Sequence, residues 1–201
     1  LYVIANSKER VLPDLYPYPQ GQEILSHQVE RILSNSLVNI VNPLAENYKN
    51  TKAYYRTDTH WSDLGAFNAF KLCMKTLGYS ENYNEYFNFL EREVIGDLGS
   101  KLNPPVSSFK MVHAFNGGKK SVRCVFDNKI QKTGSLKVYL NEDAAYQKSV
   151  VMFGGSSLTA GGFSRYFTYF FSRVVVINLP GSIVKEIVDY ENPDHVIVQT
   201  N

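Results

Sequence analysis

A carboxylate and an imidazole stand two residues apart within the segment Tyr54–Gly65, at Asp58 and His60. In an extended segment residues i and i+2 point to the same side, so the two side chains can share one pocket. Such a pair supplies a general base and the residue that orients it, and it becomes reactive when a nucleophile or a metal ion joins it. Another part of the chain must therefore complete the site.

A turn of small residues much later in the sequence offers a nucleophile. An apolar run at 149–153 leads into Gly154-Gly155-Ser156-Ser157, and a helical pattern follows. In open α/β sheets, ligands bind outside the carboxyl ends of the strands, where loops and helix N-termini expose backbone N–H groups. A serine in that position presents its hydroxyl, and neighbouring N–H groups can receive an oxyanion. Taken alone, this turn is better explained as an unreactive Gly/Ser helix cap, so the case for a nucleophile depends on its combination with Asp58 and His60.

Alternating strands and helices are predicted to position the two segments. Apolar runs predict strands at 1–5, 37–41, 149–153, 174–178 and 195–200. Helical spacing of apolar residues predicts helices at 21–35, 63–77, 81–92, 159–171 and 182–190. Short β-like runs broken by glycines predict a β-rich excursion at about 104–140. The order indicates an α/β domain whose mainly parallel sheet is covered on both faces.

The composition is that of a globular protein. Of 201 residues, 44% are hydrophobic and 20% are charged, so one domain spanning 1–201 can form a full core. The net charge of +2 is too small to indicate a nucleic-acid partner. No apolar run reaches the roughly 18 residues that a membrane-spanning helix needs. Because the chain begins at Leu1 inside an apparent strand, we expect that preceding residues were lost or removed.

Two local features leave alternatives open. Between residues 116 and 140, Asp127 is the one acid against six basic residues, namely Lys119, Lys120, Arg123, Lys129, Lys132 and Lys137. This excess indicates either a positive surface or a solvated strand face. Cys73 and Cys124 lie far apart without metal-ligand spacing, so one disulfide and two free thiols both fit the sequence.

Two motifs resemble those of a known family. Residues 155–161, Gly-Ser-Ser-Leu-Thr-Ala-Gly, resemble the Gly-Asp-Ser-Leu block of SGNH/GDSL hydrolases. Asp58-Thr59-His60-Trp61 resembles the Asp-x-His-Trp signature of the alginate O-acetyltransferase family (AlgJ/AlgX type). Ordinary SGNH hydrolases have the serine block first, whereas the order here is reversed, as in that family. Weaker similarities extend the resemblance over nearly the whole chain, at Val3–Lys8 with Tyr16-Pro17, at Gly96-Asp97-Leu98, at 171–175 and at 192–197.

The resemblance implies an SGNH-hydrolase-like three-layer domain with permuted motif order and a Ser-His-Asp triad. In it Ser157 would be the nucleophile, His60 the general base and Asp58 the residue that orients the imidazole. A second register, Gly154-Gly155-Ser156-Ser157, would make Ser156 the nucleophile. We prefer Ser157, because Leu158-Thr159-Ala160-Gly161 then aligns with the family block.

The same resemblance implies a serine-dependent O-acetyltransferase that acylates a sugar hydroxyl of an extracellular or capsular polysaccharide. It further implies a periplasmic or exported location and a membrane-bound partner protein that supplies acetyl groups. Beyond the acetyl donor we expect no cofactor, and no third ligand at recognisable spacing joins Asp58 and His60, so we expect no metal. Candidate sugar-binding residues are Trp61, Tyr55 and Arg56, although Trp61 suits a packed core equally well. A carbohydrate esterase with the same triad and a non-catalytic polysaccharide-binding module are the alternatives.

Overall fold

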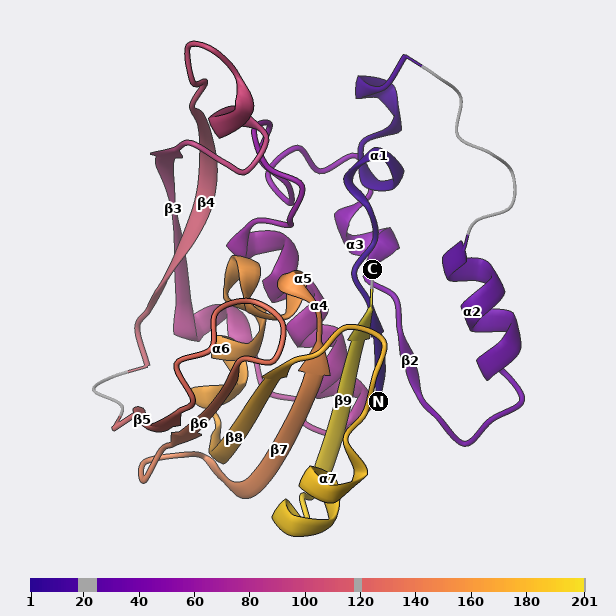
Figure 1. The fold of residues 1–201 in the computed structure, drawn as a ribbon, viewed down its shortest axis with the longest axis vertical. Coiled ribbons are helices and arrows are strands. Elements are labelled where there is room, and N and C mark those ends of the chain that lie inside the picture. The colour runs from indigo at the N-terminus through magenta and orange to yellow at the C-terminus, as the bar shows by residue number, and fades with distance from the viewer. Residues whose placement is uncertain (18–24, 118–120, 201) are drawn as a thin grey trace.

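A seven-stranded sheet forms the centre of the protein in a computed structural model that describes residues 1–17, 25–117 and 121–200 (Figure 1). The strand order is β2-β1-β9-β7-β8-β6-β5. The five strands from β2 to β8 pair in parallel, and β6 and β5 continue the sheet in antiparallel fashion. The sheet strands are β1 (Tyr2–Ile4), β2 (Ile40–Val41), β5 (Arg123–Asp127), β6 (Leu136–Leu140), β7 (Tyr146–Gly154), β8 (Phe171–Asn178) and β9 (His195–Thr200).

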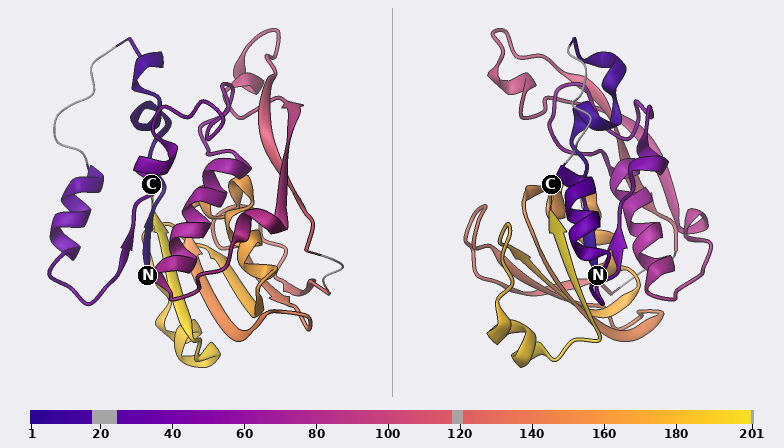
Figure 2. Two further views of the ribbon diagram at one scale, coloured as in Figure 1. Left: turned by 180° about the vertical axis from the view of Figure 1, so that it is seen from behind. Right: turned by 90° about the vertical axis from the view of Figure 1, so that its right-hand side faces the viewer.

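Helices cover both faces of this sheet. On one face lie α4 (Asp63–Thr76), α5 (Ser156–Thr159) and α6 (Phe163–Thr168), and on the other lies α7 (Lys185–Glu191) (Figure 2). Alternate residues of β7 belong to two separate apolar clusters, as the two-residue period of a strand requires. Met152 packs in the cluster of α4 and α6, and Phe153 packs with Val188 of α7. The sheet is thus the middle of three layers.

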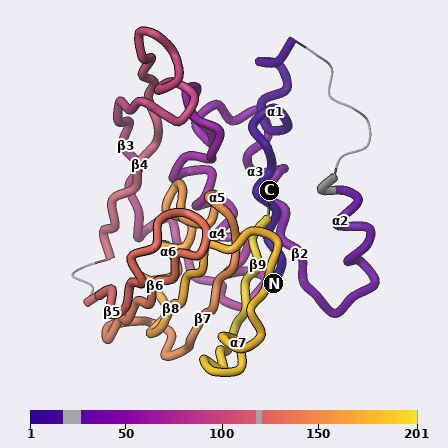
Figure 3. The backbone as a smooth tube through the Cα atoms, viewed as in Figure 1, coloured from indigo at the N-terminus to yellow at the C-terminus, as the bar shows by residue number. Residues whose placement is uncertain are grey.

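The remaining elements surround this sandwich. A separate antiparallel hairpin, β3 (Phe87–Val94) and β4 (Ser108–Phe115), packs beside α4 (Figure 3). The other α-helices are α1 (Lys8–Val11), α2 (Leu25–Leu33) and α3 (Leu44–Asn47). Four 3-10 helices complete the described elements, at Pro13–Leu15, Tyr83–Tyr86, Gly99–Lys101 and Ala160–Gly162. Within the described residues, no helix combines the length and apolar character needed to cross a membrane.

The predicted α/β architecture and mainly parallel sheet are confirmed, and three local predictions need correction. Residues 81–92 do not form one helix, because only Tyr83–Tyr86 is helical, as a 3-10 turn. From Phe87 onward the chain is strand β3, which alternates the buried Phe87 with the exposed Asn88. The β-rich stretch predicted at about 104–140 contains β4, β5 and β6, but it is divided between two sheets, since β4 pairs with β3 whereas β5 and β6 extend the main sheet. The helix predicted at 159–171 is interrupted, because Gly161 and Gly162 adopt left-handed φ values of 59° and 71°.

The basic segment and the cysteines have simple structural accounts. Acidic neighbours accompany several cations, since Arg123 pairs with Glu142 while Lys129 and Lys137 both lie 3.5 Å from Asp127. These pairs agree with a solvated strand face, and Lys119 and Lys120 lie outside the described residues.

Cys73 is buried and Cys124 exposed, and both are free thiols. Burial raises the pKa of the Cys73 thiol.

Candidate active site

The two motifs meet at the edge of the sheet where the parallel strands end. The Asp58-His60 loop, the segment after β1 and the turn after β7 line one cavity there, as expected for ligand sites of open α/β sheets. This cavity has a volume of about 300 Å³. Its lining residues include Ser7, Lys8, Glu9, Tyr16, His60, Leu98, Ser156 and Ser157.

Asp58 and His60 are brought together by a turn, whereas an extended segment was expected. The loop is closed by a bridge between Tyr54 and Trp61. Within it the backbone N–H of His60 donates to Asp58 Oδ1 at 2.8 Å, an Asx-type turn. The same oxygen lies 2.7 Å from His60 Nδ1. An ionised carboxylate only accepts, so this contact places the proton of a neutral imidazole on Nδ1 and leaves Nε2 as an acceptor.

The hydroxyl that meets His60 belongs to Ser156. Its Oγ lies 2.8 Å from His60 Nε2, and its side chain is exposed at the cavity. Ser157, the preferred nucleophile in the sequence analysis, is only 6% exposed and stands one position further into α5. Successive residues of a helix point about 100° apart, so only one of the doubled serines can face the imidazole. The geometry therefore favours the second register over the preferred one.

Trp61 is buried and does not offer its face to a ligand. Only 1% of the residue is exposed, and its ring packs against Phe163 at a centroid distance of 5.3 Å. The indole N–H donates to the carbonyls of Ser157 and Ala160, at 3.0 and 3.1 Å. Trp61 therefore does not have the expected sugar-binding position. Its hydrogen bonds instead connect the Asp-His loop to the serine turn.

Tyr55 and Lys8 support the loop from two sides. The Tyr55 hydroxyl donates to Asp58 Oδ2 at 2.6 Å, so its polar end is already engaged. The ammonium of Lys8, a residue 8% exposed, donates to the carbonyls of Tyr55, Arg56 and Asp58 at 2.9, 2.8 and 3.0 Å. In the sequence Lys8 stands out only as the end of the weak family similarity at Val3–Lys8, because its partners here are backbone atoms. Arg56 has an exposed side chain, and its sugar-binding role stays a prediction.

These contacts shift the pKa values of the pair apart. Burial alone raises the pKa of the Asp58 carboxyl, but hydrogen bonds from His60, Tyr55 and the Asp97 backbone outweigh it and hold that pKa well below its usual range. The hydrogen bond to Asp58 raises the pKa of His60, with burial opposing it. The charge of Asp97 adds to the rise. Asp58 is therefore anionic and stabilises the imidazolium that forms when His60 accepts a proton.

The structure also brings Asp97 to this pair, which no spacing in the sequence revealed. Asp58, His60 and Asp97 offer one ligand atom each, all within 4.8 Å of one another. Both oxygens of Asp58 already accept two hydrogen bonds, and His60 Nδ1 is engaged with one of them. A metal ion would have to displace these contacts, so the donor set fits a hydrogen-bonded dyad better than a metal centre.

A second Asp-His pair lies deeper in the molecule. His113 Nδ1 on β4 lies 2.7 Å from Asp63 Oδ2 in the first turn of α4, and the His113 backbone N–H donates to the same oxygen at 3.0 Å. Both side chains are largely buried, 6% and 9% exposed. The pair fastens the hairpin to α4, which is a structural role.

Comparison with known proteins gives structural matches only. Neither protein-family models nor curated protein sequences match this sequence. PatB1 from Bacillus cereus, solved alone and with a sulfonyl adduct, aligns with a TM-score of 0.72 at 14% and 13% identity. These alignments cover 100% of this chain and 81% and 80% of the PatB1 chain.

Two further structures share the architecture. A DHHW family protein from Eubacterium siraeum DSM 15702 gives a TM-score of 0.67 at 12% identity, over 99% of this chain and 76% of its own. The O-acetyltransferase domain of Pseudomonas putida AlgJ gives 0.58 at 15% identity, over 99% and 73%. At such identities the similarity establishes the fold, and the AlgJ-type, SGNH-like fold expected from the motifs is confirmed.

Proposed function

We propose that this domain is a serine-dependent O-acetyltransferase that transfers an acetyl group through Ser156 to a hydroxyl of a polysaccharide. The observation that carries the proposal is the relay from Asp58 through His60 to Ser156, which ends at an open cavity. The neighbours support it, since one is named as an O-acetyltransferase domain and another was solved with a sulfonyl adduct.

The chemistry assigns one task to each residue. His60 Nε2 accepts the proton of Ser156 as its Oγ attacks the acetyl carbonyl of the donor, and the imidazolium then protonates the leaving group. In the second half, His60 accepts the proton of a sugar hydroxyl that attacks the acetyl-serine, and it returns the proton to Ser156 Oγ. Asp58 stabilises the imidazolium in both halves. By the same logic the backbone N–H of Ser156 supplies one oxyanion donor.

Separate replacement of the two serines tests the assignment. With p-nitrophenyl acetate as donor, we expect Ser156→Ala and His60→Ala to lose acetyl release by about 10³-fold or more, whereas Ser157→Ala retains most of it. Intact-mass spectrometry should detect one added acetyl group on wild type and Ser157→Ala, and none on Ser156→Ala. Loss of activity in Ser157→Ala with full activity in Ser156→Ala would reverse the assignment. Equal rates in wild type and all variants would show that no Ser-His-Asp triad catalyses acetyl release.

The acceptor distinguishes the proposal from its nearest alternative. A carbohydrate esterase would use the same three residues with water as the acceptor. Mass spectrometry of a glycan incubated with enzyme and donor should record a gain of acetyl groups for a transferase. A loss of acetyl groups from an acetylated glycan, without any gain, would identify an esterase. Unchanged glycan binding by Ser156→Ala, with no turnover by wild type, would identify a binding module.

The proposal extends to the setting in which the enzyme acts. A polysaccharide substrate fits a periplasmic or exported location, and a membrane-bound protein that delivers acetyl groups would be the natural donor. A membrane fraction that donates acetyl groups to Ser156 of wild type, but not to the Ser156→Ala variant, would support such a partner. If no membrane fraction of cells that acetylate their polysaccharide transfers acetyl groups to a protein that still turns over p-nitrophenyl acetate, the partner hypothesis would be contradicted.

A further inference from the structure

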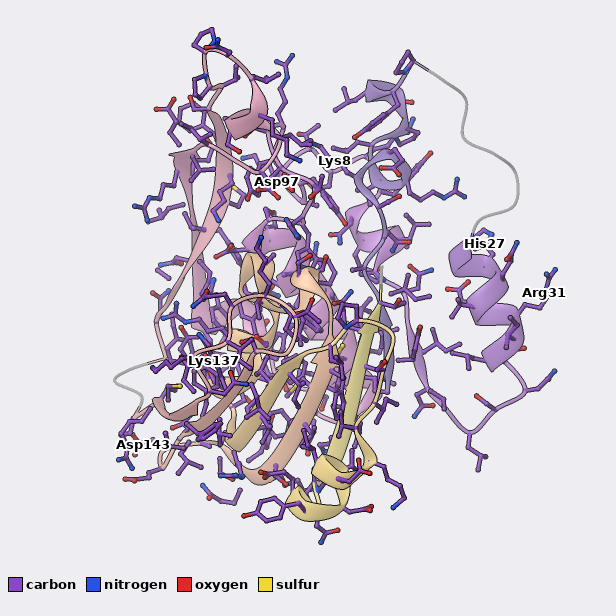
Figure 4. The ribbon with its side chains drawn as sticks, in the orientation of Figure 1. Lys8, His27, Arg31, Asp97, Lys137 and Asp143 are labelled. Carbon is purple, nitrogen blue, oxygen red and sulfur yellow. The ribbon has the colours of Figure 1, made fainter. Side chains whose placement is uncertain are left out.

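Asp97 lies in a turn that is fastened to the Asp-His loop. The turn follows β3, and the backbone N–H groups of Leu98 and Gly99 both donate to the carbonyl of Thr57, at 3.0 and 2.9 Å. Gly96 allows this approach, because a Cβ there would stand 2.2 Å from the Thr57 carbonyl oxygen. Figure 4 shows Asp97 near Lys8 above the sheet, whereas His27 lies apart on α2. The turn is therefore held rigidly beside the candidate triad.

The carboxylate and the backbone N–H of Asp97 both contact the segment that carries Asp58 and His60. Its carboxylate accepts the backbone N–H of Thr59 at 2.8 Å and the Thr59 hydroxyl at 2.5 Å. Its own backbone N–H donates to Asp58 Oδ2 at 3.0 Å. Its Oδ2 lies 4.0 Å from His60 Nδ1. A carboxylate is thus placed behind the imidazole, on the side away from Ser156.

We propose that Asp97 is a positioning residue of this site, which fixes the Thr59-His60 backbone and adds a second negative charge behind the imidazole. This inference rests on the proposed function, and it assigns a role to a residue outside the three of the triad. Asp97 touches no reacting atom, so its effect passes through Asp58 and His60.

The surroundings of His60 leave the Asp97 charge effective. Asp97 is about one-third exposed, so solvent screens its charge in part. Besides Asp97, the titratable and charged groups next to His60 are Asp58 of the loop, and Lys8 and Glu9 of α1, which line the same cavity. Tyr55 lies behind Asp58, Arg56 acts on Lys8, and Lys110 of β4 lies over the Tyr55 ring. Lys8 opposes Asp97, but its ammonium is directed at three carbonyls. The two acids Asp58 and Asp97 are the ones that raise the pKa of His60.

Removal of the Asp97 charge has a definite sign. A carboxylate favours imidazolium, so its loss lowers the pKa of His60 and moves the acid limb of the kcat/KM profile to lower pH. The imidazolium formed in the transition state also loses stabilisation, so the plateau of kcat/KM falls. A merely structural residue would lower the plateau without moving the limb.

The test compares Asp97→Asn with Asp189→Asn, which removes one exposed carboxylate from α7. An asparagine keeps an oxygen for the Thr59 N–H, and its NH2 group can donate to the Thr59 hydroxyl, so the charge is removed while both contacts can persist. The His60 pKa is measured by NMR titration in a Ser156→Ala background, with His60→Gln identifying the signal. We expect Asp97→Asn to lower this pKa by about half a unit or more, and Asp189→Asn and Asp97→Glu to leave it within about 0.2 units.

Turnover of p-nitrophenyl acetate by each variant with Ser156 intact completes the experiment. The acid limb should shift by the same amount as the NMR pKa. An unchanged His60 pKa in a folded Asp97→Asn protein would overturn the inference, whatever its activity. Absence of turnover by wild type would instead defeat the proposed function and leave the NMR result standing. If Asp97→Asn does not fold, Asp97→Ser supplies the second neutral variant.

Discussion

The indole N–H of Trp61 donates to the carbonyl oxygen of Ser157, 3.0 Å away. This hydrogen bond joins the loop that carries His60 to the turn that carries Ser156, although 96 positions separate Trp61 from Ser157. It also holds the backbone of Ser157 toward the core, which leaves Ser156 to face the cavity. Trp61 of the Asp-x-His-Trp motif therefore helps to determine that Ser156, and not Ser157, faces His60.

Replacement of this tryptophan should affect activity as well as stability. Trp61→Phe keeps an aromatic ring but removes the donor to two carbonyls, so we expect a loss of about 1–3 kcal/mol in the free energy of unfolding. We also expect kcat/KM to fall by about tenfold or more, because the Ser156-His60 distance is no longer fixed. Urea unfolding and acetyl-release kinetics measure the two effects.

Tyr83→Phe is the matched control for Trp61→Phe. Tyr83 is a buried aromatic residue whose hydroxyl lies 3.1 Å from that of Tyr146, away from the serine turn. Its removal should cost about 0.5–1.5 kcal/mol of stability and leave kcat/KM unchanged. Equal activity losses in both variants would show that Trp61 acts through global stability alone.

Lys8→Met should disorganise the loop around Asp58. Three carbonyls lose a charged donor, so we expect a loss of about 2 kcal/mol or more in unfolding free energy and about tenfold in kcat/KM. Lys8→Arg should recover only part of this, because an ammonium directs three donors from one nitrogen to three carbonyls, whereas a planar guanidinium spreads its donors over three nitrogens.

Lys110→Met is the control for the loss of a neighbouring cation. The Lys110 ammonium lies 5.3 Å over the Tyr55 ring, yet its replacement should change kcat/KM little. Chemical denaturation and steady-state kinetics of the three lysine variants provide the measurement. Wild-type kinetics in Lys8→Met would contradict the supporting role of Lys8.

The pH of maximal stability should lie below the pH of maximal activity. The folded-state pKa of His60 is raised above 6.5, so its stabilising contribution is complete below 6.5 and is lost as the pH rises through the folded value. The folded-state pKa of Asp58 is depressed below 3.8, so its contribution is complete above 3.8 and is lost as the pH falls through the folded value. Both groups therefore stabilise the folded state fully between pH 3.8 and pH 6.5.

Activity follows the opposite limb of the His60 titration, because a general base must be unprotonated. We expect kcat/KM to rise with a midpoint above 6.5, while the unfolding free energy declines over the same interval. Denaturation and kinetics across pH 4 to 9 measure both curves, and His60→Gln should flatten the decline. A stability curve that still falls equally in His60→Gln would assign the decline to other groups.

Gly96→Ala should displace the turn that carries Asp97. A Cβ at this position would stand 2.2 Å from the Thr57 carbonyl oxygen and 2.7 Å from Asp58 Cβ, so the backbone must move. We expect a loss of about 1–3 kcal/mol in unfolding free energy together with reduced kcat/KM.

Gly155→Ala provides the comparison for stability. Its Cβ would approach Pro180 no closer than 3.6 Å, so the unfolding free energy should change by less than about 1 kcal/mol. Thermal and urea unfolding of the two variants decide the matter. Equal stability of the Gly96→Ala and Gly155→Ala proteins would contradict the tight packing of the turn against the loop.

The sequence by itself determines the class of fold, the Asp58-His60 pair and the turn that supplies the serine. These features can be predicted because they depend on residue types at short spacing. An apolar run predicts a strand buried on both faces, and a capping residue such as Ser62 predicts the start of a helix. The helix beginning at Asp63 and the strands β7 and β9 lie close to their predicted places for this reason.

Only the tertiary structure decided which serine faces the imidazole and which residues support it. Ser156 and Ser157 have the same side chain, and their difference arises from the direction of α5 and from the Trp61 hydrogen bond. Lys8 binds backbone carbonyls, which every residue possesses, so no side-chain pattern reveals its partners. Asp97 joins the pair because a turn after β3 is fastened to Thr57. Contacts of this kind depend on the path of the chain through space, and residue types at short spacing do not record it.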